Sequence, residues 1–118
     1  MLKLDLIGRL GRDAELKTLD GGGKVVNFAV ATDVGHGENM RAQWSDCALY
    51  GSRAEKLAPF LTKGREVFVT GTGAPRIIDG RNGQSVILDV KVFDVQLVGA
   101  KPQSDPAGYQ TNDDAPAV

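Results

Sequence analysis

Residues 44–64 read WSDCALYGSRAEKLAPFLTKG, in which a strand-like run is followed directly by a helix-like run. In a strand, successive side chains point to opposite faces, so residues separated by an even number share a face. Trp44 and Tyr50 are therefore predicted to share one face of a strand over residues 43–51. The opposite, inward face is expected to carry Ser45, Cys47 and Leu49.

The second half of this stretch predicts a short helix. Ser52 and Glu55 have the spacing of a capping box, with Ser52 as the N-cap, and Lys63-Gly64 is a typical helix end. Pro59 lies inside the run and removes one helical hydrogen bond. We therefore expect two turns and a kink or a 3₁₀ finish.

Four other long segments have strand character, and one of them contains a glycine, Gly8, that predicts a bulge or a sharp coil. A short strand over residues 14–19 is followed by a hairpin signal, Asp20-Gly21-Gly22-Gly23. Residues 33–42 are predicted to be a mobile loop and residues 74–84 a hairpin arm. The four long segments cover residues 2–10, 24–32, 65–73 and 85–98.

The order of these elements decides the fold. Three long strands, one helix and two further long strands follow one another, which is the topology of the five-stranded OB barrel. The sequence therefore predicts an all-β fold with one short helix between strands three and four. The exposed face and the loops of OB barrels bind oligonucleotides and oligosaccharides.

The length and the charge distribution indicate one folded domain and a tail. The 118 residues suit a single domain, which we expect over residues 1–100. Residues 101–118 carry three Pro and three Asp with almost no large apolar side chain, and are predicted to be disordered. The net charge is −1, so a DNA-binding function requires basic groups gathered on one surface.

Several classes of protein are not expected. Cys47 and His36 are the only Cys and His, so the sequence predicts no disulfide, no metal site and no cofactor. Gly21-Gly22-Gly23 lacks the Lys-Ser/Thr ending of a phosphate-binding loop, and we expect no enzymatic activity. Asp5 stands where a signal peptide would be apolar, and no apolar run is long enough to span a membrane. We expect a cytoplasmic protein.

The shared face of Trp44 and Tyr50 is the main functional signal from the residues themselves. Flat rings on a sheet face flanked by Lys and Arg are how proteins hold unpaired nucleic acid, because every base has a π-face. The same rings could instead close an edge of the core, as many strand aromatics do. Spacing alone leaves both interpretations open.

Several motifs resemble those of the bacterial and phage single-stranded-DNA-binding proteins. IGRLGRDAEL at residues 7–16 is similar to the first-strand signature of that family. Residues 28–32 resemble its second strand, and the Trp44–Gly51 run resembles its third. Leu57, residues 61–64 and residues 67–71 resemble the helix end and the fourth strand. The resemblance covers residues 2–98.

The resemblance implies an OB fold, sequence-tolerant binding of single-stranded DNA, and a homotetramer. The family keeps DNA single-stranded during replication, recombination and repair, and recruits other proteins. Trp44 and Tyr50 take the places of two base-stacking aromatics. The basic positions that the family often carries correspond to Lys3, Lys17, Lys63 and Arg76. Loop or bulge positions near the expected groove add Arg9, Arg41 and Arg81.

The chain also departs from the family. Positions that commonly hold two further stacking Trp residues correspond to His36, which can still stack, and Ile78, which offers only apolar contact. Asp46 shares the face of Trp44 and is expected to repel phosphate. The acidic tip through which the family docks partners has a reduced counterpart in Asp113, Asp114, Pro116 and Val118. A short tail and fewer aromatics suggest a phage or plasmid member.

Two other functions remain open at this level. The first is a protein-interaction adaptor of the primosome type, in which the sheet chiefly contacts protein and DNA binding is weak. The second is an oligosaccharide-binding OB domain, whose binding would be nearly independent of salt. A homo-oligomer is expected on separate grounds, because the apolar strands over residues 2–10 and 85–98 lie near barrel edges that invite pairing with another copy.

Overall fold

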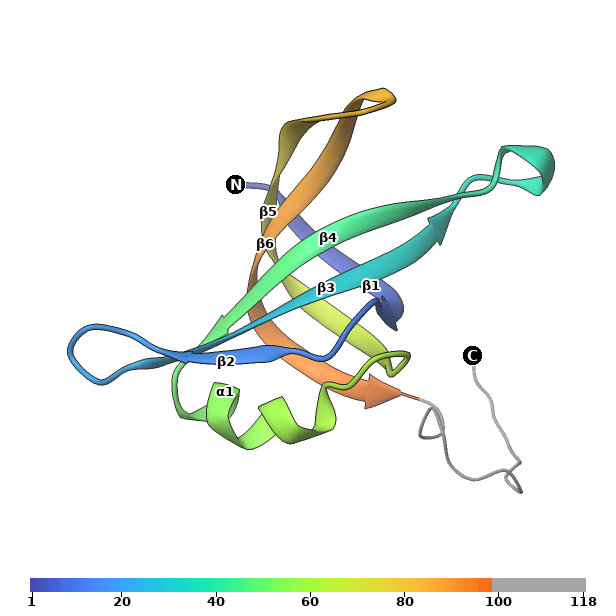
Figure 1. The fold of residues 1–118 in the computed structure, drawn as a ribbon. Coiled ribbons are helices and arrows are strands. Elements are labelled where there is room, and N and C mark those ends of the chain that lie inside the picture. Colours follow the sequence, from blue (N-terminus) through green and yellow to red (C-terminus); the bar gives the residue numbers. More distant parts are fainter. Residues whose placement is uncertain (99–118) are drawn as a thin grey trace.

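Six strands and one short α-helix lie in residues 1–98, the part of the chain that the computed structural model describes (Figure 1). The predicted tail and its docking residues fall outside these described residues. Two 3₁₀ turns complete the elements, η1 (Gly37–Asn39) and η2 (Ala58–Phe60). The strands and the helix are β1 (Lys3–Leu10), β2 (Glu15–Thr18), β3 (Lys24–Val34), β4 (Arg41–Tyr50), α1 (Ser52–Leu57), β5 (Glu66–Gly80) and β6 (Gly83–Val98).

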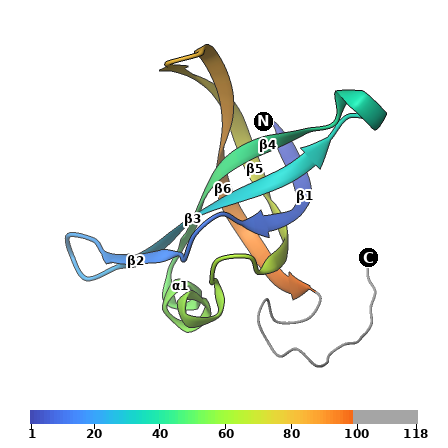
Figure 2. The ribbon, with the colours of Figure 1, turned by 45° about the vertical axis from the view of Figure 1, so that its right-hand side comes forward.

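Five of the strands close into a ring, and this confirms the predicted all-β fold. The sheet order is β1-β5-β6-β4-β3-β2, and an additional pairing of β1 with β3 closes the barrel. β2 is a short hairpin partner of β3 outside the ring. The helix lies between β4 and β5, which are the third and fourth of the long strands predicted from the sequence (Figures 1 and 2).

Gly8 lies where β1, still paired with β5, comes close to β3. β1 pairs with β5 through Gly8, and Arg9 and Leu10 also pair with Ala31 and Val30 of β3. A Cβ on Gly8 would collide with the carbonyl oxygen of Ala31 and lie 2.7 Å from Cγ1 of Val30. Gly8 therefore does not interrupt the pairing of β1 with β5, which continues to Arg9. It is instead the point where β1 comes so close to β3 that only glycine fits.

A bulge lies instead between β5 and β6. Thr70 pairs with Asp94 and Gly71 with Val92, which leaves Phe93 as the extra residue. A bulge bends and twists its strand, and the parts of β5 and β6 nearest their connecting turn extend past the barrel as a long arm (Figure 1). The arm ends in a two-residue turn between Gly80 and Gly83, as the sequence predicts.

The predicted capping box is wrong. Gly51, with φ 101°, is the N-cap, and no side chain makes a capping hydrogen bond. The reason is the sharp exit from β4: the Gly51 N–H bonds to the Lys24 carbonyl, so Ser52 already falls in the first turn. The 3₁₀ finish at Pro59 is confirmed by η2. None of the helices in residues 1–98 is long and apolar enough to cross a membrane.

The predicted loop over residues 33–42 is shorter than expected. β3 continues to Val34 and β4 begins at Arg41, so the two strands pair almost to the turn η1. The β3–β4 hairpin and the β5–β6 arm both project from the barrel and point in different directions (Figures 1 and 2).

The core fills the barrel with inward side chains from every ring strand and from α1. Val, Leu and Phe residues dominate, as expected for strands buried on one face. The buried cluster comprises Leu10, Val26, Phe28, Val30, Cys47, Leu49, Ala54, Leu61, Val67, Val69, Val90, Val92 and Val95.

Candidate nucleic-acid interface

β4 has the two faces that its sequence predicts. Ser45, Cys47 and Leu49 are buried in the barrel, and burial raises the pKa of the Cys47 thiol to about 12, with a further contribution from the Asp46 charge. Trp44 and Tyr50 are 42% and 53% exposed on the opposite face. The two rings therefore do not close an edge of the core, and both are available to a ligand.

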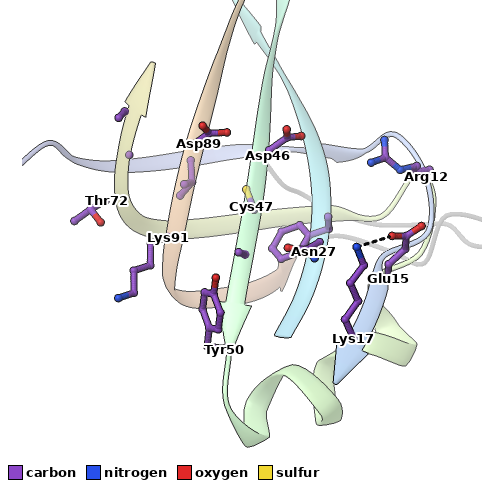
Figure 3. A pocket seen from close by; sticks show the side chains of 15 residues that line it. Arg12, Glu15, Lys17, Asn27, Asp46, Cys47, Tyr50, Thr72, Asp89 and Lys91 are labelled. Carbon is purple, nitrogen blue, oxygen red and sulfur yellow. Dashed lines mark ion pairs between the residues drawn. The ribbon is translucent and has the colours of Figure 1, made fainter. Parts of the chain in front are cut away.

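An open groove of about 900 Å³ runs over the outer face of the sheet beside Tyr50 (Figure 3). Its floor comes from β3, β4 and β6, and its sides come from β2, β5 and the turn after β1. The polar side chains that line it are Arg12, Glu15, Lys17, Asn27, Asp46, Tyr50, Thr72, Asp89 and Lys91.

Tyr50 lies between two lysines at one end of this groove. Lys91 lies on β6, the strand beside β4, and is paired there with Ala48 of β4. Lys17 of β2 lies on the other side of the ring and forms a 3.8 Å ion pair with Glu15 (Figure 3). An exposed ring between two ammonium groups can accept a stacked base while its phosphates meet positive charge.

Trp44 lies outside this lining, at the rim formed by the turn after β1. Its ring contacts Gly11, which directly precedes the groove residue Arg12. The Gly11 N–H bonds to the carbonyl of Ala29 over 3.1 Å and so fixes the turn on β3. Tyr50 is six positions along the strand from Trp44, which places their Cα atoms about 20 Å apart. The two rings are therefore separate platforms for different bases.

Arg76 lies beside the groove lining and is held there by two carboxylates of the groove. Asp46 and Asp89 are direct neighbours on the parallel strands β4 and β6. Arg76 donates from Nε to Asp89 over 2.8 Å, and from Nη2 to Asp89 over 3.0 Å and to Asp46 over 2.9 Å. The hydrogen bond from Arg76 lowers the pKa of Asp89. The expected repulsion by Asp46 is thus countered by a neighbouring cation.

Of three other predicted basic residues, one extends the groove and two lie outside its lining. Lys3 pairs with the groove residue Thr72 and shares its face, so Lys3 extends the groove along β1. Arg9 donates to the Gly64 carbonyl over 3.1 Å, and Lys63 next to Gly64 donates its backbone N–H to Asp13. Arg9 and Lys63 therefore lie together at the start of β5, outside the groove lining.

The remaining predicted residues lie on the two projecting hairpins. His36 and Arg41 are exposed at the end of the β3–β4 hairpin, on either side of η1. Ile78 is on β5 in the arm, and Arg81 is in the turn at its tip. These four side chains are not part of the groove lining, and a role in binding stays a prediction for each.

Sequence reasoning missed two cations of the groove, Arg12 and Lys91. Lys91 stands between Val90 and Val92, both buried, so strand alternation was a signal that this lysine points outward. Arg12 could not be assigned in this way, because it lies in a turn whose direction depends on tertiary contacts.

The sequence of this chain is similar to those of known single-strand binding proteins. The model of the "Single-strand binding protein family" matches residues 1–98. The chain is 30% identical over 120 residues to a single-stranded DNA-binding protein 1 of Chlorobaculum tepidum, covering 93% of this chain and 74% of that one. It is 33% identical over 115 residues to a single-stranded DNA-binding protein of Oceanobacillus iheyensis, covering 91% and 71%.

A solved structure has the same architecture. It is the Plasmodium falciparum SSB complex with single-stranded DNA, which matches with a TM-score of 0.67 and 26% sequence identity. The match covers 84% of this chain and 96% of that chain.

Proposed function

Because this chain belongs to the single-strand binding protein family, we propose that it binds single-stranded DNA with little sequence preference. The observation that carries this proposal is the pair of exposed rings, Trp44 and Tyr50, on one face of β4 beside an open groove with lysines on both sides. In this proposal the rings hold bases and the lysines hold phosphates.

The stacking surfaces explain the low sequence preference. Each base presents a π-face, so an aromatic ring accepts any of the four, at about 1–3 kcal/mol per base. Trp44 and Tyr50 lie about 20 Å apart along β4, so a bound strand passes over the groove between two stacked positions. Direct hydrogen bonds to base edges are not needed for this mode of binding.

The phosphate contacts are local rather than a property of the whole chain. Arg12, Lys17 and Lys91 line the groove, and Lys3 extends it on β1 through its pairing with Thr72. A net charge of −1 gives little long-range attraction to DNA. Affinity is therefore expected to depend on these few contacts and to fall as salt increases.

Fluorescence anisotropy with labelled oligonucleotides tests the proposal. Labelled oligo(dT) and a single strand of mixed sequence are titrated with the protein at two salt concentrations, and a duplex of the same length serves as the control. We expect similar affinity for both single strands, weaker binding at high salt and much weaker binding to the duplex. Equal affinity for the duplex, or no binding to any DNA, would contradict the proposal.

The two alternatives are distinguished by the same titrations. The protein-adaptor function is not favoured by the family match or by the DNA-bound structural relative. It would bind oligo(dT) only weakly at either salt concentration. An oligosaccharide-binding domain would also use exposed aromatics, but its binding would hardly respond to salt, because a neutral sugar releases no counterions.

We also propose that the protein is a homotetramer. Within residues 1–98, β1 pairs along its length with β5 on one side, whereas β3 meets only Arg9 and Leu10 on the other. The first part of β1 thus has an open edge, and Leu2 and Ile7 beside it are half-exposed. An open apolar edge invites pairing with another chain. Light scattering should give four times the chain mass of 12.5 kDa.

The cellular role follows from the same proposal. A non-enzymatic protein that keeps DNA single-stranded would act in the cytoplasm during replication, recombination and repair. The tail residues Asp113, Asp114, Pro116 and Val118 are proposed to contact other proteins of these processes. A phage or plasmid origin stays a prediction.

A further inference from the structure

We propose that Arg76 acts as an internal counter-ion of the groove: it neutralises Asp46 and Asp89 so that DNA phosphates can pass, and it does not itself bind phosphate. This inference rests on the proposed function. It changes the role that the sequence suggests for Arg76, which was that of a direct phosphate contact.

Two carboxylates lie side by side in the groove. Asp46 and Asp89 are paired across neighbouring parallel strands, and both line the groove (Figure 3). Neighbouring strands lie about 4.8 Å apart, and like charges directly opposite each other are destabilising. Without a cation beside them, the two carboxylates would repel each other and any phosphate above them.

The guanidinium of Arg76 is already engaged by these two carboxylates. A guanidinium binds a phosphate best through a two-pronged edge, in which two neighbouring nitrogens donate parallel N–H···O bonds. In Arg76 the Nε–Nη2 edge is already bound to both oxygens of Asp89, over 2.8 and 3.0 Å. Nη2 also donates to Asp46 over 2.9 Å. Nη2 belongs to both two-pronged edges of the guanidinium, so neither edge is wholly free for a phosphate, and only Nη1 stays outside these hydrogen bonds.

The side chains that line the groove carry equal numbers of positive and negative charges. Three cations, Arg12, Lys17 and Lys91, line it together with three carboxylates, Glu15, Asp46 and Asp89. These charges cancel, so the positive charge in excess comes from Arg76 beside the lining and from Lys3, which extends the groove. Removal of Arg76 would reduce this excess and leave two adjacent carboxylates facing the bound DNA.

A double-mutant cycle tests this role, because it measures whether two changes act through each other. Affinity for oligo(dT) is measured for wild type, Arg76→Gln, the Asp46→Asn/Asp89→Asn variant and the triple variant. We expect about a tenfold loss in Arg76→Gln at low salt. In the background without the carboxylates no repulsion is left to neutralise, so the same substitution should cost clearly less affinity than it does in wild type.

Direct phosphate binding by Arg76 gives a different result. Arg76→Gln would then lose the same affinity in both backgrounds, and the salt slope would fall by about 0.7 in each. That outcome would overturn the inference while wild-type binding still supported the proposed function. If wild type itself fails to bind oligo(dT), the proposed function fails first.

Two further variants provide a matched control and a test that does not depend on the folding of Arg76→Gln. Arg53 also pairs with an aspartate, Asp94, but outside the groove lining, so Arg53→Gln should leave DNA affinity unchanged. If Arg76→Gln does not fold, the Asp46→Asn/Asp89→Asn variant is tested alone. It retains Arg76 and should bind oligo(dT) more tightly than wild type; weaker binding would overturn the inference.

Discussion

The ring of Trp44 lies directly over Gly11: a methyl group on Gly11 would come within 2.6 Å of Cη2 and 2.7 Å of Cζ3 of the indole. The turn after β1 therefore supports a side chain of β4 at the rim of the groove. Support of this kind fixes the ring before a ligand arrives, which reduces the ordering that binding requires.

This contact predicts that Gly11→Ala displaces the Trp44 ring. Because the added methyl overlaps the indole, we expect a shift in Trp fluorescence and a loss of several-fold in affinity for oligo(dT), with the fold retained. Gly23→Ala is the matched control, since its nearest neighbour would be Leu19 Cδ1 at 3.8 Å. Unchanged fluorescence and affinity in Gly11→Ala would show that the ring position does not matter.

Removal of either ring should weaken binding. If each ring stacks one base at about 1–3 kcal/mol, Trp44→Ala and Tyr50→Ala should each reduce affinity by about 5- to 150-fold. Phe60→Ala is the control, because Phe60 is equally exposed but lies outside the groove lining. An effect of Phe60→Ala as large as that of Tyr50→Ala would argue against stacking in the groove.

The groove lysines should determine the response to salt. Lys91→Gln removes one phosphate contact in our proposal, and the slope of log affinity against log salt should become shallower by about 0.7. Lys56 lies on α1, away from the groove lining, so Lys56→Gln should leave the slope unchanged. Affinities measured over several salt concentrations test both variants; equal slopes for Lys91→Gln and wild type would exclude a phosphate contact.

Closure of the barrel should depend on Gly8. A methyl group there would collide with the Ala31 carbonyl and approach Thr32 Oγ1 to 2.8 Å. Gly8→Ala is therefore expected to lower the free energy of unfolding by about 2 kcal/mol or more, measured by urea denaturation. In Gly80→Ala the added methyl meets only the Gly83 carbonyl at 3.5 Å, so its loss should be much smaller; equal losses would contradict this account of closure.

The Cys47 thiol should be unreactive in the folded protein. Burial raises its pKa from 9.0 to about 12, so iodoacetamide at pH 8 should label Cys47 only after unfolding in urea. Above pH 9 the unfolded state loses this proton and the folded state keeps it, so the free energy of unfolding should fall as the pH rises towards 12. Cys47→Ala should lack this contribution, and rapid labelling of the native protein would contradict burial.

The fold could be predicted from the sequence because its main signals are local. The alternation of Ser45, Cys47 and Leu49 against Trp44 and Tyr50 depends only on strand geometry, and the structure follows it. The helix start could not be predicted as well. Ser52 has a favourable capping sequence, but Gly51 takes the cap, because its hydrogen bond to Lys24 on another strand fixes the exit from β4.

The site was less predictable, because it depends on which strands become neighbours. Lys17 and Tyr50 come together in the groove, whereas Arg9 is drawn to Gly64 at the start of β5. The engagement of Arg76 by Asp89 arises from the pairing of β5 with β6 and of β6 with β4. Residue type alone cannot distinguish a free cation from one that is held by carboxylates.

Quenching of Trp44 fluorescence by a long oligo(dT), at low and at high salt, tests the central claim most directly. Trp44 is the only Trp in the chain, so the signal reports one position at the rim of the groove. The account predicts strong, saturable quenching that weakens as salt increases. Binding seen by anisotropy without any quenching would contradict stacking on Trp44, and no binding at all would contradict the proposed function.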